Sequence, residues 1–391
     1  MDAAQCPPSR RAMLSYNNLM ADFDVIVCGL GATGCAALYR LAAAGARVLG
    51  LDRYPPGHDR GSSHGLTRVI RQGYFEHPSY VPLVRRAYDL WRDLEAATGR
   101  QLLHVSGIAE IGPPDGVLIR GTLESSRLHG LRHEVLDADA LMARFPAFRV
   151  PREVVGVVQP DGGFLEVEPA IAAFVAQAEI AGAEVRSGET VHAVEPDGAG
   201  VRVTTDRGVA TARQAIIAAG AWATTLAPGL PLRVTRQVTA WFAPADERPF
   251  AAGRFPVFLA ESRHGMHYGI PPHGGYGLKV AKHHHGDETV DPDTMDRAVS
   301  PADEAMIRDF VADYVPAANG AMTGARTCLY TMTPDGDFII DRMPGAANII
   351  VASPCSGHGF KFAPAIGEIL CGLALEGTTT HDISRFRLSR F

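Results

Sequence analysis

The sequence predicts an α/β protein that combines a parallel sheet with a second, mainly antiparallel sheet. Residues 22–53 have the pattern of a buried strand at 23–28, a glycine turn, a helix and a second strand, VLGLD at 48–52. Two further segments, 208–223 and 348–370, each place an apolar strand before a glycine-containing turn. By contrast, residues 237–245 (QVTAWFAPA) alternate in polarity and are followed by Gly/Pro turns, which is typical of antiparallel strands.

The strand at residues 23–28 leads into the glycine pattern G-x-G-x-x-G, and an alanine-rich helix is expected at 33–44. Such glycines allow a tight turn and a close approach of backbone to a pyrophosphate, while the helix offers N–H groups and its positive end. The next strand closes on Asp52, 18 residues after the last glycine, where a carboxylate can accept both ribose hydroxyls. A glycine turn that only serves packing would not explain this aspartate. The pattern therefore predicts a Rossmann-like dinucleotide site with Gly29, Gly31, Gly34 and Asp52.

Two later segments favour FAD over NAD as the dinucleotide. Residues 208–223 form a strand that runs into Ala-Ala-Gly-Ala-Trp, with Gly220 where a second backbone can approach a cofactor. Residues 348–370 read as a strand, a glycine-rich loop and a helix near the C-terminus. A site assembled from the beginning, the middle and the end of the chain suits a long cofactor with two lobes.

Composition excludes several classes of protein. The 391 residues carry 37 Lys+Arg against 43 Asp+Glu, a net charge of −6, and no basic stripe that would suit nucleic acid. Six cysteines without CxxC spacing indicate separate thiols in a reducing compartment. The first 21 residues lack the apolar stretch of a secretory signal, and no run of about 18 apolar residues occurs. We expect a cytoplasmic, soluble protein with a flexible N-terminal tail at 1–21.

Two insertions separate the cofactor segments. The first begins with apolar residues at three- and four-residue spacing, which predicts a helix, and the second begins with the alternating pattern. We expect them to form one substrate-binding domain with a sheet as its floor. The predicted FAD-binding domain comprises residues 22–75, 161–235 and 326–391, and the predicted substrate-binding domain comprises 76–160 and 236–325.

Short motifs follow one another in a fixed order from about residue 23 to the end. They are GLGATG (29–34), HGLTRVIR (64–71), YVPL (80–83), GGFL (162–165), AAGAW (218–222), GLKVAKH (277–283), CLY (328–330), DFIID (337–341), SGHGFKF (356–362) and the tail HDISRFRLSRF. With these motifs the chain resembles the monomeric sarcosine oxidase and N-methyltryptophan oxidase family, which are flavin amine oxidases of the D-amino-acid-oxidase superfamily. The resemblance implies a GR2-type FAD-binding domain, a second substrate domain and a monomer.

Cys328 has no second cysteine nearby to bridge it or to share a metal. Judged by its residue type alone, it would be a small buried hydrophobe. The resemblance implies instead that its sulfur is bonded to the 8α-methyl carbon of the flavin. A single thiolate can add to that electrophilic methyl group, so no partner cysteine is needed.

The resemblance also assigns the remaining contacts with the cofactor. They come from His64, Thr67 and Arg68, and from Gly357, His358 and Gly359, which are expected to open the last helix. Backbone N–H groups at that helix start would stabilise the anionic reduced flavin. Leu66 replaces an acidic residue of the family motif, which puts the local charge balance around Arg68 in question.

Arg71 and Lys361 match the family's clamp for a substrate carboxylate, although most arginines and lysines are solvated surface charges. Lys361 stands between two phenylalanines after a glycine loop, which is unusual for a solvated lysine. Lys279 matches the residue that assists the reaction with O2; the alternative is a strand-edge lysine whose amine reaches solvent. His283 is assigned to the substrate side, as a base or an orienting group, or else it only packs.

Tyr268 and Tyr330 match tyrosines of the family pocket, although a tyrosine is as often part of a core. The run of histidines at 283–285 does not predict a metal site, because residues placed in succession on a strand point to alternating faces.

These assignments predict an enzyme that oxidises sarcosine, N-methyltryptophan or a similar N-methyl amino acid. The resemblance implies hydride transfer from the amine carbon to flavin N5, hydrolysis of the imine, and reduction of O2 to hydrogen peroxide. Three alternatives remain open at this point: an oxidase of a cyclic imino acid such as proline or pipecolate, a dehydrogenase that uses another electron acceptor, and a flavin-binding protein without turnover.

Overall fold

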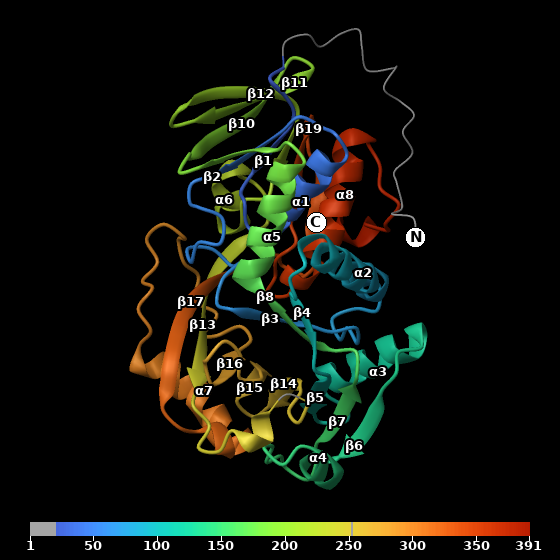
Figure 1. The fold of residues 1–391 in the computed structure, drawn as a ribbon, viewed down its shortest axis with the longest axis vertical. Coiled ribbons are helices and arrows are strands. Elements are labelled where there is room, and N and C mark those ends of the chain that lie inside the picture. Colours follow the sequence, from blue (N-terminus) through green and yellow to red (C-terminus); the bar gives the residue numbers. More distant parts are fainter. Residues whose placement is uncertain (1–20, 252) are drawn as a thin grey trace.

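The computed structural model describes residues 21–251 and 253–391. The tail predicted at 1–21 therefore lies almost entirely outside the described residues. None of the helices in the described part of the chain has the length and apolar character that a membrane crossing requires. Two large sheets lie at opposite ends of the molecule, with a small three-stranded sheet between them (Figure 1).

The first large sheet contains the predicted parallel strands. Strands β1, β2, β9, β12 and β19 pair in parallel, whereas β10, β11 and β18 are added antiparallel at its margins. Its members are β1 (Phe23–Cys28), β2 (Val48–Asp52), β9 (Glu184–Ser187), β10 (Val191–Asp197), β11 (Gly200–Thr205), β12 (Gly208–Ile217), β18 (Ile339–Met343) and β19 (Ala346–Ser353).

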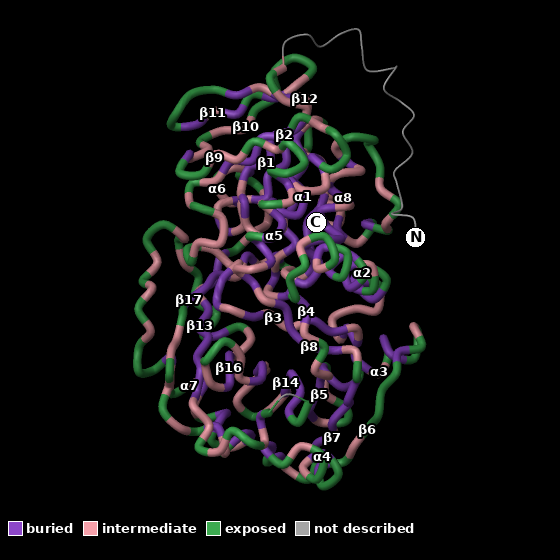
Figure 2. Tube along the Cα trace, in the orientation of Figure 1, coloured by how far each residue is buried: buried purple, intermediate pink, exposed green. Residues whose placement is uncertain are grey.

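Both faces of this sheet are buried, as parallel strands require. Val25 and Val27 of β1 pack into a core with helices of one face, while Ile26 and Cys28 enter a second core on the other face. Figure 2 shows mainly buried residues in β1 and β2, whereas β10 and β11 at the margin carry exposed residues. The helices of the first core are α1 (Ala32–Ala43), α2 (Tyr80–Thr98), α5 (Val167–Ile180) and α8 (Ala363–Leu375).

The second large sheet is antiparallel except where β14 runs parallel to β5. Its order is β17-β13-β16-β15-β14-β5-β7-β6. Its members are β5 (Ile108–Gly112), β6 (Glu134–Asp137), β7 (Val155–Gln159), β13 (Arg233–Phe242), β14 (Val257–Ser262), β15 (Gly265–Ile270), β16 (Leu278–Lys282) and β17 (Met322–Met332). The predicted α/β class, with a Rossmann-like sheet and a mainly antiparallel sheet, is confirmed.

One face of the second sheet packs on α7 (Pro301–Tyr314) and α4 (Ala138–Arg144) through an apolar core. Because side chains alternate along a strand, residues between those core positions project to the opposite face, toward the rest of the molecule. The small sheet, β3-β8-β4, lies on that side; its strands are β3 (Thr67–Ile70), β8 (Gly163–Glu166) and β4 (Leu103–Val105). Helix α3 (Val117–His129) and the short α6 (Ala223–Leu226) are the remaining α-helices in the described part of the chain.

The segment limits expected at residues 235 and 326 fall inside β13 and β17, which pair along their whole length in the second sheet. The division into a cofactor-binding and a substrate-binding domain at those residues stays a prediction.

Candidate active site

A cavity of about 390 Å³ opens at the carboxyl ends of β1 and β2, and we call it the Asp52 cavity. Gly29, Gly31, Asp52 and Gly220 line it, as predicted for a dinucleotide site. The Asp52 carboxylate accepts hydrogen bonds from the Leu30 N–H at 2.6 Å and the Tyr54 N–H at 2.8 Å.

The glycines of the first turn are required by close packing of backbone against backbone. A Cβ on Gly29 would lie 2.6 Å from the carbonyl oxygen of Ala218, and its φ of +100° belongs to the left-handed region. A Cβ on Gly34 would lie only 1.8 Å from the carbonyl oxygen of Gly29. Gly34 thus lets α1 pack against the turn, and it does not itself line the cavity.

A second cavity of about 140 Å³ lies between the small sheet, β17 and the loop before α8; we call it the Cys328 cavity. It brings together ten of the predicted site residues. They are Arg68, Arg71, Tyr268, His283, Cys328, Tyr330, Gly357, His358, Gly359 and Lys361. Cys328 and Tyr330 are two residues apart on β17 and so share a face, which makes the second sheet one wall of the site.

The two cavities adjoin, because six residues line both: Ala32, Thr33, Ser62, Ser63, Pro354 and Cys355. The start of α1 therefore stands at the junction, where its N–H groups and dipole favour a pyrophosphate. A cofactor with two lobes fits this arrangement, with Asp52 at one end and Cys328 at the other. The residues present fit FAD.

The predicted carboxylate clamp is buried and is already engaged with protein groups. Arg71 is 2% exposed; its Nη2 donates to both carboxylate oxygens of Glu76 at 2.6 Å, and its Nη1 donates to the Gly73 carbonyl. Burial opposes the arginine's charge, but Glu76 holds the pKa of Arg71 above its ordinary value. Burial likewise opposes the charge of Glu76, yet Arg71 lowers the pKa of this carboxyl to about 2.

Lys361 lies 5% exposed beside this ion pair, on η4 (Phe360–Phe362), which follows the glycine loop directly. Its Nζ donates to the carbonyl of His358 at 2.7 Å. Burial, together with Arg71, lowers the pKa of Lys361 to about 7. The prediction that residues 357–359 open the last helix is wrong, since they form the loop before η4, with Gly359 as its N-cap, and α8 begins at Ala363.

The glycine loop is shaped by its neighbours. Gly357 has a φ of +83°, and a Cβ there would lie 2.6 Å from the ring of Tyr330 and 2.8 Å from that of His283. His358 shares a hydrogen bond with the Tyr74 hydroxyl at 2.6 Å, and burial lowers the pKa of His358 to about 4. The loop therefore presents its backbone to the cavity with a neutral histidine behind it.

Lys279 was predicted to lie near the flavin. It is buried but lines neither cavity. It alternates with Leu278 and Val280, which enter the core under α7, so its side chain projects toward the small sheet. There the Nζ atom donates to the carbonyl oxygens of Gly65 and Thr67, both at 2.7 Å. Burial and the neighbouring guanidinium of Arg68 hold the pKa of Lys279 well below its ordinary value.

His64 and Thr67 also stand behind the cavity wall, and both are buried. Arg68 reaches the cavity and is held by two backbone carbonyls, those of Thr67 and Ser62. The acidic residue missing at Leu66 is compensated from α5, since Glu168 accepts hydrogen bonds from the Gly65 and Leu66 N–H groups.

The histidine run 283–285 does not lie on a strand, and this expectation is wrong. Strand β16 ends at Lys282, and the backbone turns at His284, which has a φ of +58°. The rings of His283 and His284 lie side by side, with centroids 4.0 Å apart. His283 Nδ1 approaches the Tyr330 hydroxyl at 3.3 Å, and burial lowers the pKa of His283 to about 3. His285 points away, to the carboxylate of Asp303 at 2.9 Å.

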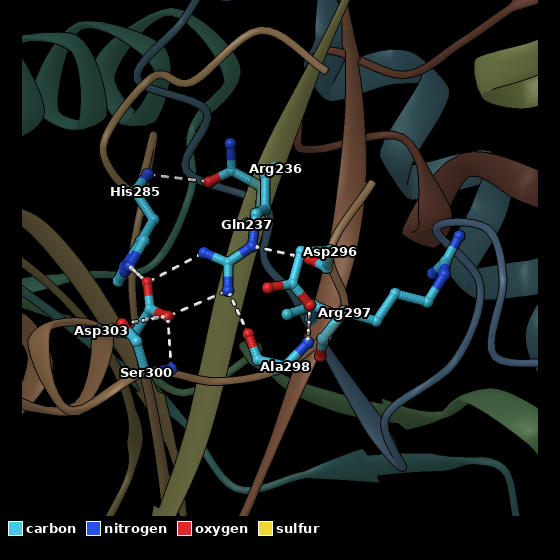
Figure 3. A network of polar contacts seen from close by, with 9 residues as sticks. Arg236, Gln237, His285, Asp296, Arg297, Ala298, Ser300 and Asp303 are labelled. Carbon is cyan, nitrogen blue, oxygen red and sulfur yellow. Dashed lines mark hydrogen bonds and ion pairs between the residues drawn. The ribbon is translucent and has the colours of Figure 1, made fainter. Parts of the chain in front are cut away.

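A polar network fixes this turn (Figure 3). Asp303 caps α7 through Ser300 and receives two hydrogen bonds from the guanidinium of Arg236, both at 2.9 Å, besides that of His285. The backbone N–H of His285 donates in turn to Gln237. Asp303 thereby anchors the end of the turn whose beginning carries His283.

The thiol of Cys328 is 7% exposed and faces the cavity. Burial raises the pKa of Cys328, while Arg68 and Lys279 act in the opposite direction. Burial also raises the pKa of Tyr268 to about 12, so this neighbouring phenol is neutral at physiological pH.

Three residues of the site were missed by the sequence analysis: Tyr74, Glu76 and Glu110. Glu110 on β5 is fully buried 3.9 Å from Arg71, and burial raises its pKa to about 7. Tyr74 and Glu76 follow Arg71 within five residues, and the acidic residue in the aromatic segment YFEHP was the available signal. No comparable signal marked Glu110, because it is one polar position within an apolar strand.

Relatives with established names cover nearly the whole chain. Monomeric sarcosine oxidase of Streptomyces avermitilis is 41% identical over 371 residues, which cover 93% of this chain and 96% of the relative. N-methyl-L-tryptophan oxidase of Salmonella typhi is 40% identical over 370 residues, covering 94% and 99%. Among solved structures, NikD, an unusual amino acid oxidase essential for nikkomycin biosynthesis, aligns with a TM-score of 0.84 at 29% identity and covers 94% of this chain and 98% of that chain.

The profile of the family described as FAD dependent oxidoreductase matches residues 24–373. This range begins in β1, includes the linings of both cavities and ends in α8. The predicted family is thus confirmed by the match and by the two relatives, and the chain belongs to the FAD dependent oxidoreductase family.

Proposed function

We propose that this chain is an FAD-dependent oxidase of an amino acid with a secondary amine, such as sarcosine or N-methyltryptophan. The observation that carries the proposal is the pair of buried cationic side chains, Arg71 and Lys361, in a cavity that adjoins a dinucleotide cradle. The names of the relatives support the same substrate class. A protein that only stored a flavin would gain nothing from two buried cations there.

Arg71 and Lys361 bind the substrate carboxylate. A guanidinium provides directed N–H donors, and a buried ammonium adds a charge that is little screened by water. Glu76 holds Arg71 in place by two hydrogen bonds, so the arginine is oriented before the substrate arrives. The carboxylate is thereby held at one end of the cavity, and the amine at the other.

His283 and Tyr330 line the part of the cavity that remains for the amine. Because its pKa is lowered to about 3, His283 is neutral at physiological pH and can accept a hydrogen bond from the amine. When bound, FAD would supply the acceptor for a hydride equivalent from the amine carbon and would pass the electrons to O2, which gives hydrogen peroxide. The oxidised substrate is an imine, which hydrolyses. Tyr268 and Tyr330 exclude water from this region.

When it is protonated, Lys279 places a positive charge behind the wall formed by Gly65 and Thr67. The carbonyl oxygens of these two residues hold the amine in one position, so a proton on Lys279 would favour negative charge that develops nearby during the reaction with O2. A Lys279→Met variant should be reoxidised by O2 at least tenfold more slowly, with carboxylate binding unchanged. Unchanged reoxidation would remove Lys279 from this role.

Cys328 is the proposed site of covalent attachment to the flavin. Its thiol faces the cavity, and Arg68 and Lys279 favour the thiolate that must react. Precipitation of the purified protein with acid should leave the yellow colour in the pellet, and Cys328→Ser should release it to the supernatant. A wild-type pellet without colour would contradict the attachment.

The substrate class is tested by the release of hydrogen peroxide from sarcosine, N-methyltryptophan, proline and pipecolate. We expect turnover of at least one N-methyl amino acid and its loss in the Arg71→Met, Lys361→Met double variant. Turnover of proline or pipecolate alone would favour the cyclic imino acid alternative. Flavin reduction without peroxide would favour a dehydrogenase, and a yellow protein inert toward all four would favour a flavin-binding protein without turnover.

A further inference from the structure

Two histidines and a glutamate converge beside Phe164 at the small sheet, and none of the three lines the Cys328 cavity. His104 Nε2 lies 2.9 Å and His273 Nε2 lies 3.0 Å from the same carboxylate oxygen of Glu166. One ligand atom from each of the three residues falls within 4.8 Å of the other two. Within residues 21–251 and 253–391, this is the one group of three such side chains with that spacing.

The three side chains come from distant parts of the chain and are held by packing. His104 is on β4 and Glu166 ends β8, and His273 belongs to the loop after β15. The ring of Phe164 stacks on His104 with an angle of 8° between their planes and meets His273 edge to face. The two imidazoles are thus oriented by an apolar neighbour, and their Nε2 atoms point to one position.

We propose that His104, Glu166 and His273 form a binding site for one divalent transition metal ion of the zinc type. Imidazole nitrogens and a carboxylate oxygen are ligands of Zn²⁺, with bonds of about 2.0–2.1 Å that place neighbouring ligand atoms about 3.3 Å apart in tetrahedral geometry. The two histidine–glutamate separations, 2.9 and 3.0 Å, lie within a few tenths of an ångström of that value, and the ligand atoms of the two histidines lie within 4.8 Å of each other. The site is empty in this structure.

Each neutral imidazole can take part in both the metal-free and the metal-bound site. With its proton on Nε2 it donates a hydrogen bond to Glu166, and with its proton on Nδ1 its Nε2 offers a lone pair to the metal. Side-chain exposures of 21%, 18% and 30% for His104, Glu166 and His273 leave an approach for the ion. His104 and His273 also line a large surface cleft, from which water could occupy a fourth coordination position.

A metal at this position would fasten the loop that carries His273 to the small sheet. Glu166 pairs with Thr67 across the sheet, and the carbonyl of Thr67 holds Lys279. The ion would therefore stabilise the layer behind the Cys328 cavity without touching the cavity itself. The competing interpretation is a hydrogen-bonded clamp in which Glu166 accepts from both histidines and no metal binds.

The test is a titration of the full-length holoenzyme, free of any affinity tag and dialysed against a chelator, with ZnCl₂ in a calorimeter. We expect one equivalent of Zn²⁺ to bind and to raise the melting temperature. His273→Gln changes a loop residue and leaves the sheets intact. Its affinity for Zn²⁺ should fall at least about 100-fold, because loss of a metal ligand weakens binding more than loss of a residue that only hydrogen-bonds to a ligand. His104→Gln should give the same result.

His264→Gln is the matched control. His264 is also 21% exposed and also contacts a carboxylate, that of Asp313 at 2.6 Å, but it has no second histidine. This variant should bind Zn²⁺ as the wild type does. Absence of stoichiometric binding to the wild type would overturn the proposal in favour of the hydrogen-bonded clamp, and so would equal binding by the wild type and His273→Gln.

Discussion

Replacing Lys361 with methionine should remove the part of the pH dependence of carboxylate binding above pH 7 that is due to this amine. The pKa of Lys361 is lowered from 10.5 to about 7, chiefly by burial. Since one pKa unit corresponds to about 1.36 kcal/mol, charging this lysine costs about 5 kcal/mol more here than in water. A bound carboxylate offsets that cost and therefore prefers the protonated amine. As pH rises through 7 the proton is lost, so affinity should fall about tenfold per pH unit, to about 100-fold at pH 9.

The ligand for this assay is acetate, because it has no amine that titrates in the same range, and its binding is followed by the change in flavin absorbance from pH 6 to 9. Glu110, whose pKa is also about 7, would add negative charge beside Arg71 as pH rises. The control is therefore Glu110→Gln, which should keep the part of the profile that is due to Lys361. The Lys361→Met, Glu110→Gln double variant should show a flat profile. A flat wild-type profile, or a tenfold change per pH unit in the double variant, would refute the reasoning.

Two further predictions concern the elements that hold the site. Asp303→Ala should lower the free energy of unfolding by about 3 kcal/mol in urea, because it leaves a largely buried arginine without its partner. The exposed ion pair of Asp246 provides the control, and Asp246→Ala should cause no measurable change; equal losses would contradict the argument. Gly34→Ala places a Cβ 1.8 Å from the Gly29 carbonyl, so FAD content should fall at least tenfold and unfolding free energy by about 1–3 kcal/mol. Gly324→Ala, whose Cβ would have 3.6 Å to its nearest neighbour, should retain both, and a full FAD content in Gly34→Ala would contradict the prediction.

The nucleotide-binding half of the fold could be predicted from local patterns. The expected strands at 23–28 and 48–52 coincide with β1 and β2, and the helix expected at 33–44 is α1, displaced by one residue. Here the periodicity, the glycines and the terminal aspartate all require the same short-range geometry. The prediction of a strand at 283–285 was wrong because the strand ends at Lys282. The left-handed backbone at His284 could not be predicted, since histidine is not a residue type that indicates a positive φ.

The candidate site was predicted where a motif carried it and missed where only tertiary contact defines it. Lys279 was assigned to the cofactor, but its partners Gly65 and Thr67 are more than 200 residues away in sequence. Glu166 is likewise 62 residues from His104 and 107 residues from His273 in sequence, so no local pattern indicates their contact. Residue type indicates what a group can do, whereas the distance to its partner decides whether it does so.

The charge balance of the Cys328 cavity follows from such contacts and constrains how a substrate binds. Arg71 is paired with Glu76, a carboxylate that stays ionised because its pKa is about 2, so this pair brings no net charge to a ligand. Next to this pair, net positive charge comes from Lys361 when it is protonated, whereas the guanidinium of Arg68 lines the cavity near Cys328. Arg71 contributes directed N–H groups and orientation, while Lys361 contributes charge. Binding of a carboxylate should therefore be coupled to uptake of a proton above pH 7, and the two members of the clamp are not interchangeable.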